Sequence, residues 1–203
     1  TQGIPARNGY LLCAETLNEK GGILGRPVEF LIHDDASDPE RARALYRELL
    51  AGGEVGAILG PYGSTLTEAV APVTEEFGAV HISPLAATTS IWEQGRTHLF
   101  MVLPPAELFL AGLIELGHDH GHTRVGVLHE EALFPAAAAR GAVELARERG
   151  MEVVLEEGFP GTLEDFGPLV EKVQAAGVDV LGMAASNLDH FITMTRAMRE
   201  RGV

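Results

Sequence analysis

The chain has 203 residues, of which 15 are Lys or Arg and 29 are Asp or Glu, so its formal net charge at pH 7 is −14. A protein this acidic repels nucleic acid and anionic membrane surfaces, which argues against both as partners. Hydrophobic residues make up 46% of the sequence, enough for a real core and too many for a disordered chain. The length fits one large domain or two lobes of about 100 residues each.

The single cysteine, Cys13, excludes a disulfide within the chain. It lies in an apolar helical stretch with no basic neighbour that would make the thiol reactive, so we predict a buried, inert side chain. No apolar run approaches the ~20 residues of a membrane span. No signal peptide is visible, so the chain is either cytoplasmic or a mature or trimmed product. Its start in a helix without a preceding strand favours trimming.

The first half of the sequence alternates amphipathic helices with short apolar strands. Asp38 is a typical N-cap and Pro39 a typical first helical residue, so a helix begins there. In the following helix, Leu66 to Phe77 carry apolar residues at helical spacing, and Gly78 marks the end. The predicted helices cover about 7–20, 38–51 and 65–77, and the predicted strands cover 27–33, 55–59, 79–82 and 97–102.

The same pattern restarts after Pro104 and Pro105. In the last helix, the spacing of Phe191, Met194 and Met198 predicts that all three point inward. The predicted helices cover about 106–116, 134–149, 165–176 and 188–201, and the predicted strands cover 124–128, 151–155 and 178–183.

This alternation predicts an α/β fold with two Rossmann-like lobes, each a parallel sheet flanked by helices. The restart places an N-terminal lobe at 1–103 and a C-terminal lobe at 104–203. In open parallel sheets, ligands lie beyond the carboxyl ends of the strands. The candidate site loops are therefore 34–38, 60–65, 83–90, 129–135 and 184–188.

The stretch 60–67 (GPYGSTLT) places hydroxyl groups at the start of a helix that follows a strand. Helix N-termini favour anions, so a ligand carboxylate could accept hydrogen bonds from a backbone N–H and from the Ser64 hydroxyl. Alternatively, Thr65 and Glu68 form an S/T-x-x-E capping box, which would make Thr65 the N-cap. The sequence leaves both interpretations open.

The loop 83–90 (SPLAATTS) follows the next strand and contains mainly small and hydroxyl residues. Small residues let a ligand approach backbone carbonyls, which could accept hydrogen bonds from an ammonium group. A polar surface loop is the alternative interpretation.

Other clusters of polar residues predict no chemistry. His118, His120 and His122 crowd a helix-to-strand connection, away from the candidate loops, so we predict a solvated loop and no metal site. Asp34 and Asp35 match no EF-hand spacing. The sequence lacks the common signatures of nucleotide-binding loops, serine hydrolases and zinc proteases, so we predict neither a cofactor nor an enzyme.

Several segments occur in an ordered set: 17–28 (LNEKGGILGRPV), 33–39 (HDDASDP), 58–64 (ILGPYGS), 80–84 (VHISP), 127–130 (VLHE) with Phe134, and Asp165 with Phe166. This set resembles the leucine/isoleucine/valine-type periplasmic binding proteins, which serve branched-chain amino acid ABC transporters and have the type I periplasmic binding fold. Each motif alone is weakly specific, whereas the ordered set covers nearly the whole chain.

The resemblance implies a protein outside the cytoplasm whose two lobes close on a small solute for import by an ABC transporter permease. The solute would be an amino acid, an amide or an aromatic acid. Ser64 would hold its carboxylate or amide, and residues 85–88 would receive its ammonium group. The implied ligand-binding residues are Tyr62, Gly63, Ser64, Leu85, Ala86, Ala87, Thr88, Phe134 and Asn187.

The chain departs from the family pattern at informative places. Ser37 and Gly63 stand where leucine-type members have a disulfide, Ala87 where they have an ammonium-binding threonine, and Phe134 where tyrosine is common. These departures argue against a plain α-amino acid and leave room for an amide or an aromatic acid. Family members also have a strand before the first helix and continue past Val203, so the resemblance implies a chain incomplete at both ends.

Two other functions stay open. A ligand-sensing domain of the same fold, in an amide-type regulator or a receptor ectodomain, would suit Tyr62, which matches a pocket tyrosine of the amide-binding branch. A small α/β enzyme would need turnover that depends on Ser64.

Overall fold

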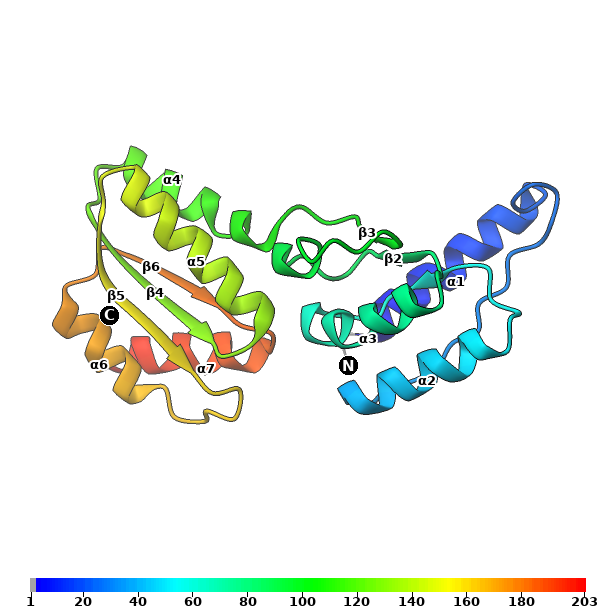
Figure 1. The fold of residues 1–203 in the computed structure, drawn as a ribbon. Helices are drawn as coiled ribbons and strands as arrows, with labels where there is room; N and C mark the ends of the chain where they lie inside the picture. The colour runs from blue at the N-terminus through cyan, green and yellow to red at the C-terminus, as the bar shows by residue number, and fades with distance from the viewer. Residues whose placement is uncertain (1–2) are drawn as a thin grey trace. The chain divides into compact units, whose positions relative to one another are not determined.

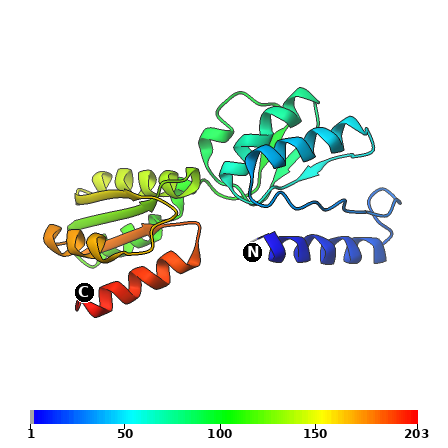
Figure 2. The ribbon, with the colours of Figure 1, turned by 90° about the horizontal axis from the view of Figure 1, so that it is seen from below.

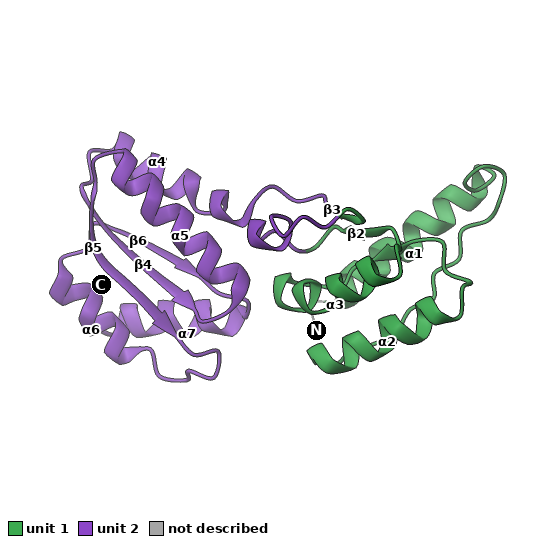
Figure 3. Ribbon diagram, viewed as in Figure 1, with its two compact units in different colours: residues 1–85, 97–100 green, residues 86–96, 101–203 purple. Residues whose placement is uncertain are grey.

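The structure is a computed structural model that describes residues 3–203. These residues form two compact units (Figure 3). Unit 1 comprises residues up to 85 together with 97–100, and unit 2 comprises 86–96 and 101–203. The predicted lobe boundary at 103–104 stays a prediction.

Unit 1 contains a short sheet in the order β1-β2-β3, in which β1 and β2 are parallel (Figure 1). Its elements are α1 (Gly3–Glu19), α2 (Pro39–Ala51), β1 (Ile58–Leu59), α3 (Ser64–Glu76), β2 (His81–Ser83) and β3 (Leu99–Met101). Ala42 of α2 packs with Leu66 and Val70 of α3, and Tyr46 covers this cluster.

The predicted start of α2 is confirmed. The Asp38 carboxylate accepts hydrogen bonds from the N–H groups of Glu40 (2.8 Å) and Arg41 (3.0 Å), which satisfies two donors that the first helical turn leaves open. Pro39 occupies the first helical turn, where its missing N–H costs nothing. In α3, however, Phe77 does not share the buried face of the helix: it is 42% exposed, because the helix ends at Glu76 and the chain turns at Gly78 with φ 61°.

Two predictions at the start of unit 1 are wrong. Residues 27–33 do not form a strand. The side chain of Asn18, at the end of α1, binds both backbone groups of Val28, so these groups are not available to a neighbouring strand. Cys13 is exposed rather than buried: of the described residues of helix α1, Ala14 alone is buried, so the helix packs little of its surface against the rest of unit 1.

Glu75, near the end of α3, joins this helix to the segment that enters β3. Its carboxylate accepts hydrogen bonds from the Thr97 hydroxyl (2.7 Å), the Thr97 N–H (3.0 Å) and the His98 N–H (3.1 Å). These bonds, with the Thr97 hydroxyl first, lower the pKa of Glu75 from 4.5 to about 2.

We therefore expect Glu75 to make unit 1 sensitive to acid. Because the folded pKa is lowered, the stabilisation is complete above the unfolded value of 4.5 and is lost as the pH falls toward about 2. Urea midpoints measured across this range should fall more steeply for the wild type than for Glu75→Gln. Glu48→Gln, on an exposed face of α2, is the control and should follow the wild type. Equal slopes for the wild type and Glu75→Gln would contradict the assignment.

Unit 2 contains a parallel sheet in the order β5-β4-β6. Its elements are η1 (Thr89–Ile91), η2 (Ala106–Leu108), α4 (Ala111–Asp119), β4 (Arg124–Glu130), α5 (Leu133–Glu148), β5 (Glu152–Phe159), α6 (Gly167–Ala176), β6 (Val180–Ala184) and α7 (Leu188–Glu200). Two hydrophobic clusters bury the two faces of this sheet. One includes Ile114 of α4 and Val143 of α5, and the other includes Val170 of α6 and Met194 of α7. Figures 1 and 2 accordingly show α5 and α7 on opposite faces of the sheet.

The helices of unit 2 follow the predictions with two exceptions. The helix predicted over 106–116 is divided into η2 and α4. In α7, Met194 is buried and Met198 packs against the core as predicted, but Phe191 is 36% exposed. The buried stripe runs through His190, Met194 and Ala197, so Phe191 lies at its edge.

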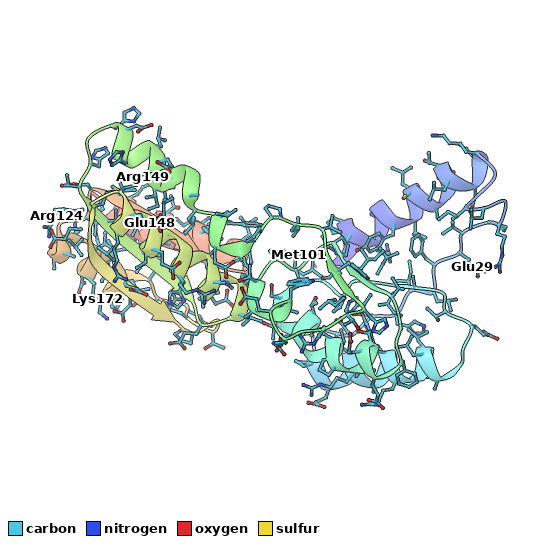
Figure 4. All side chains as sticks on the ribbon, turned by 45° about the horizontal axis from the view of Figure 1, so that its top comes forward. Glu29, Met101, Arg124, Glu148, Arg149 and Lys172 are labelled. Atoms are coloured by element: carbon cyan, nitrogen blue, oxygen red, sulfur yellow. The ribbon has the colours of Figure 1, made fainter. Side chains whose placement is uncertain are left out.

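Ion pairs tie the end of unit 2 where the strands begin. Arg124 binds Glu152 at 2.8 Å, and Arg149 binds Glu115 at 2.5 Å. Figure 4 labels Arg124 and Arg149 at this end of the unit. These pairs are exposed and contribute little to stability. The candidate loops of unit 2 lie at the opposite end of the sheet, where the strands finish. Among residues 3–203, no helix combines the length and the apolar character that a membrane crossing requires.

Candidate functional site

In unit 1, the turn after β1 contacts the loop after β2. Because β1 and β2 are parallel neighbours, their carboxyl ends lie at the same edge of the sheet. The Gly63 N–H donates a hydrogen bond to the Leu85 carbonyl (3.0 Å) across this edge. Gly60 and Gly63 have φ values of 100° and 88°, a backbone conformation that glycine adopts without strain. The structure thus places Tyr62, Gly63, Ser64 and Leu85 together.

Ser64 is the first residue of α3, and it is 2% exposed. The predicted capping box is wrong, because Gly63 occupies the N-cap position and no side chain caps the helix. The helix therefore begins before Thr65, which is exposed and lies within the first turn. The Ser64 side chain lies where the N–H groups of the first turn and the helix dipole favour negative charge.

Tyr62 lies on the same turn and is 44% exposed. An aromatic ring that projects from the carboxyl edge of a sheet offers apolar area and a hydroxyl to a ligand. Its position is compatible with the predicted role in lining a pocket, which stays a prediction.

Two buried polar residues, His81 and Ser83, support this turn through hydrogen bonds, a role that the sequence patterns containing them did not predict. His81 is fully buried; its Nε2 hydrogen-bonds to the Gly60 carbonyl, and its Nδ1 lies 3.1 Å from the Thr74 hydroxyl. Ser83 is also fully buried, and its hydroxyl lies 3.3 Å from that of Thr67, which in turn donates to the Gly63 carbonyl at 3.0 Å. His81 and Ser83 are two residues apart on β2 and hence on one face, the signal that could have indicated them.

We expect His81→Leu to destabilise unit 1 by about 2 kcal/mol, because it leaves the buried Gly60 carbonyl without this donor. Urea unfolding would measure the loss. Thr74→Val is the matched control, since it removes a different hydrogen-bond partner of the imidazole and leaves the bond to Gly60 in place. A larger cost for Thr74→Val than for His81→Leu would contradict the importance of the Gly60 contact.

The predicted residues 86–88 and Phe134 lie together in unit 2. Ala86, Ala87 and Thr88 are 2%, 1% and 1% exposed. Ala87 belongs to a small apolar cluster that Phe134, in the first turn of α5, covers. The Ala87 carbonyl accepts a hydrogen bond from the Ala106 N–H (2.7 Å), so one of its two lone pairs is occupied. The Phe134 ring packs edge-on against Phe109, with centroids 5.1 Å apart.

Asn187 lies in the loop after β6, and its side chain accepts a hydrogen bond from the Asp189 N–H (3.0 Å) as the N-cap of α7. The loops after β4 and β6 are at one edge of the sheet, because these strands are parallel neighbours. Phe134 and Asn187 therefore follow adjacent strands. Whether either contacts a ligand stays a prediction.

Within residues 3–203, no group of three His, Cys, Asp or Glu side chains is arranged to hold a metal ion. His118, His120 and His122 are exposed at the end of α4 and in the loop before β4. This loop precedes the strands, so it lies at the edge opposite the candidate site.

Residues 1–203 match the family model described as periplasmic binding protein. The chain belongs to the periplasmic binding protein family. The resemblance inferred from the ordered motifs is confirmed, as is the α/β fold with parallel sheets flanked by helices.

This periplasmic binding protein has relatives of known name and structure. The Leu/Ile/Val-binding protein homolog 7 of Brucella abortus (strain 2308) is 25% identical over 204 residues, which cover 96% of this chain and 51% of that protein. A leucine-, isoleucine-, valine-, threonine-, and alanine-binding protein from Brucella ovis, in a closed conformation, is similar in fold with a TM-score of 0.88, 19% identity and coverage of 100% of this chain and 54% of that one. A solute-binding protein from R. palustris in complex with 4-hydroxybenzoate has a TM-score of 0.83, 22% identity and coverage of 93% and 51%.

The chain spans about half the length of the curated relatives it matches. The two solved structures show the fold of this periplasmic binding protein, and the solutes in their names are those of the two neighbours.

Proposed function

We propose that this periplasmic binding protein captures a small carboxylate-bearing solute outside the cytoplasm and delivers it to the permease of an ABC transporter. An amino acid or an aromatic acid is the favoured class, with a short amide as the alternative solute. The names of the relatives support this proposal, since they include binders of branched-chain amino acids and of 4-hydroxybenzoate.

The observation that carries the proposal is the position of Ser64. It is the first residue of α3, directly beyond the carboxyl end of β1, and Gly63 beside it is bonded to the loop after β2. A carboxylate at this point would meet the positive end of a helix of 13 residues, the N–H groups of its first turn and one hydroxyl. A carboxylate can accept several such hydrogen bonds, and each is stronger than a bond to a neutral acceptor because the carboxylate is charged.

We infer that binding proceeds without turnover. The relatives are named as binding proteins, which supports this inference. That the two predicted lobes close on the solute stays a prediction.

Thermal unfolding of the purified full-length protein against a panel of solutes tests the proposal. The panel contains leucine, isoleucine, valine, threonine, alanine, 4-hydroxybenzoate, acetamide and urea. A solute present at 100 times its Kd should stabilise the protein by about 2.7 kcal/mol. Leucinol, which lacks the carboxylate of leucine, is the matched control if leucine binds.

A shift in unfolding temperature with a carboxylate-bearing solute, and none with its carboxylate-free analogue, would support binding of the carboxylate at Ser64. An equal shift with both would contradict it. Recovery of the solute chemically unchanged after long incubation would support binding without turnover, and its conversion would overturn that part of the proposal.

A further inference from the structure

Glu130 is a nearly buried carboxylate at the carboxyl edge of the unit 2 sheet, and the proposed function does not use it. It is the last residue of β4, the central strand, and its side chain is 13% exposed. Removing a charged group from water costs free energy unless the group is paired or hydrogen-bonded, so we expect a nearly buried carboxylate to make specific contacts. The contacts of Glu130 reach the loops that follow both neighbouring strands.

The first contact is with the loop after β6. The Glu130 Oε2 accepts a hydrogen bond from the Ser186 N–H at 2.8 Å. A backbone N–H bonded to a carboxylate makes a stronger bond than one bonded to a neutral acceptor. Ser186 directly precedes Asn187, so this bond fixes the backbone next to a residue that is predicted to bind the solute.

The second contact is with the first turn of α7. The Nδ1 of His190 lies 3.6 Å from the same oxygen, and His190 is 5% exposed. Its ring is held by Phe159 and Phe166, with centroid distances of 5.6 and 5.7 Å. The two aromatic rings therefore fix the position of the His190 imidazole, and the Glu130 carboxylate lies beside it.

The third contact is with the loop after β5. A Cβ atom on Gly161 would lie 2.9 Å from the Glu130 Oε1, so the carboxylate occupies the space that a side chain would need there. The loop after β4 is also joined to the end of β5 by a hydrogen bond from the Glu131 N–H to the Phe159 carbonyl (2.8 Å). Glu130 thus bonds to the loop after β6, faces His190 of α7 and lies beside the loop after β5.

We propose that Glu130 is a positioning residue, which holds the loop 185–187 in the place that solute binding requires. Glu130 does not touch the solute; it acts through the Ser186 N–H and the backbone that leads to Asn187. The claim that Glu130 affects solute binding rests on the proposed function. The claim that Glu130 fixes the position of loop 185–187 does not depend on that function.

Amide hydrogen exchange at Ser186 tests the hold on the loop without any ligand. Glu130→Ala removes the acceptor and should speed this exchange about tenfold. Glu130→Gln keeps an acceptor oxygen of nearly the same shape, so it should restore most of the protection. Glu131→Gln is the matched control, since it changes an exposed glutamate next in the chain and should leave the exchange unchanged.

Binding of leucine and 4-hydroxybenzoate to the same full-length variants tests the effect on the site. For whichever probe the wild type binds, Glu130→Ala should raise the Kd about tenfold, and Glu130→Gln should stay within about threefold of the wild type. Gly161→Ala, which crowds the carboxylate without removing it, should raise the Kd by itself and have no further effect in the Glu130→Ala background.

The outcomes separate the two proposals. Unchanged Ser186 exchange in Glu130→Ala would overturn the positioning role. Faster exchange with an unchanged Kd would show that the loop is not part of the binding site, and would equally overturn it. A wild type that binds neither these probes nor any other member of the panel would refute the proposed function, and the exchange data would still decide whether Glu130 holds the loop.

Discussion

We expect Gly141→Ala to destabilise unit 2 by about 3 kcal/mol, because the added methyl group has no space. Gly141 lies in α5, and a Cβ atom there would be 2.0 Å from the Glu107 carbonyl oxygen and 2.6 Å from its Cα. These are backbone atoms of η2, so a rotamer change cannot relieve the overlap. The segment around Ala106, whose N–H holds the Ala87 carbonyl, would have to move away from the helix.

Gly112→Ala is the matched control for this prediction. Gly112 is also a helical glycine, in the first turn of α4, and a Cβ there would meet no heavy atom within 4 Å. Alanine should therefore stabilise the protein by up to about 1 kcal/mol through its higher helix propensity. Urea unfolding measures both variants. If Gly141→Ala matched or exceeded the stability of the wild type, the close approach of α5 and η2 would be refuted.

We expect Ser64→Ala to weaken solute binding by about 1–3 kcal/mol, which corresponds to a rise in Kd of roughly 5- to 150-fold. The variant removes one hydrogen-bond partner of the bound carboxylate and leaves the helix N-terminus in place. Because Ser64 is buried, the variant can also change the stability of the free protein, so the free energy of unfolding without ligand must be measured alongside the Kd.

Thr65→Ala is the control for the Ser64 experiment. Thr65 carries the same kind of hydroxyl one residue later, but it is exposed and does not cap the helix. Its Kd should stay within about twofold of the wild type. An unchanged Kd for Ser64→Ala would remove this residue from the site. An equal loss in both variants would indicate a general effect on the start of α3.

The sequence predicts unit 2 better than unit 1, for a physical reason. In unit 2 the central strand β4 has a parallel neighbour on each side, and helices cover both faces, so the apolar pattern of each segment agrees with its environment. In unit 1, β1, β2 and β3 are two or three residues long, shorter than predicted. Residues 27–33 have a strand-like pattern, but a strand forms only where a neighbour takes up its hydrogen bonds, and periodicity carries no information about that neighbour.

In the candidate site too, features set by neighbouring residues could be predicted from the sequence, whereas contacts between distant residues could not. The rule that ligands lie beyond strand ends was enough to group Tyr62, Ser64 and Leu85 at one edge. The roles of His81 and Glu130 depend on partners that are 21 and 56 residues away in the sequence, Gly60 and Ser186. Spacing along the chain cannot reveal such pairs. The capping box failed for a local reason, because the backbone of Gly63 began the helix earlier than the Thr65–Glu68 pattern indicates.

The central claim is that this periplasmic binding protein binds a small carboxylate-bearing solute at the N-terminus of α3. Calorimetric titration of the purified full-length protein with leucine, isoleucine, valine, threonine, alanine and 4-hydroxybenzoate, repeated on Ser64→Ala, tests it most directly. The account predicts saturable binding of at least one of these solutes to the wild type, and a Kd at least about fivefold higher for Ser64→Ala. Binding that is equally tight in both proteins, or no saturable binding of any of these solutes to the wild type, would contradict it.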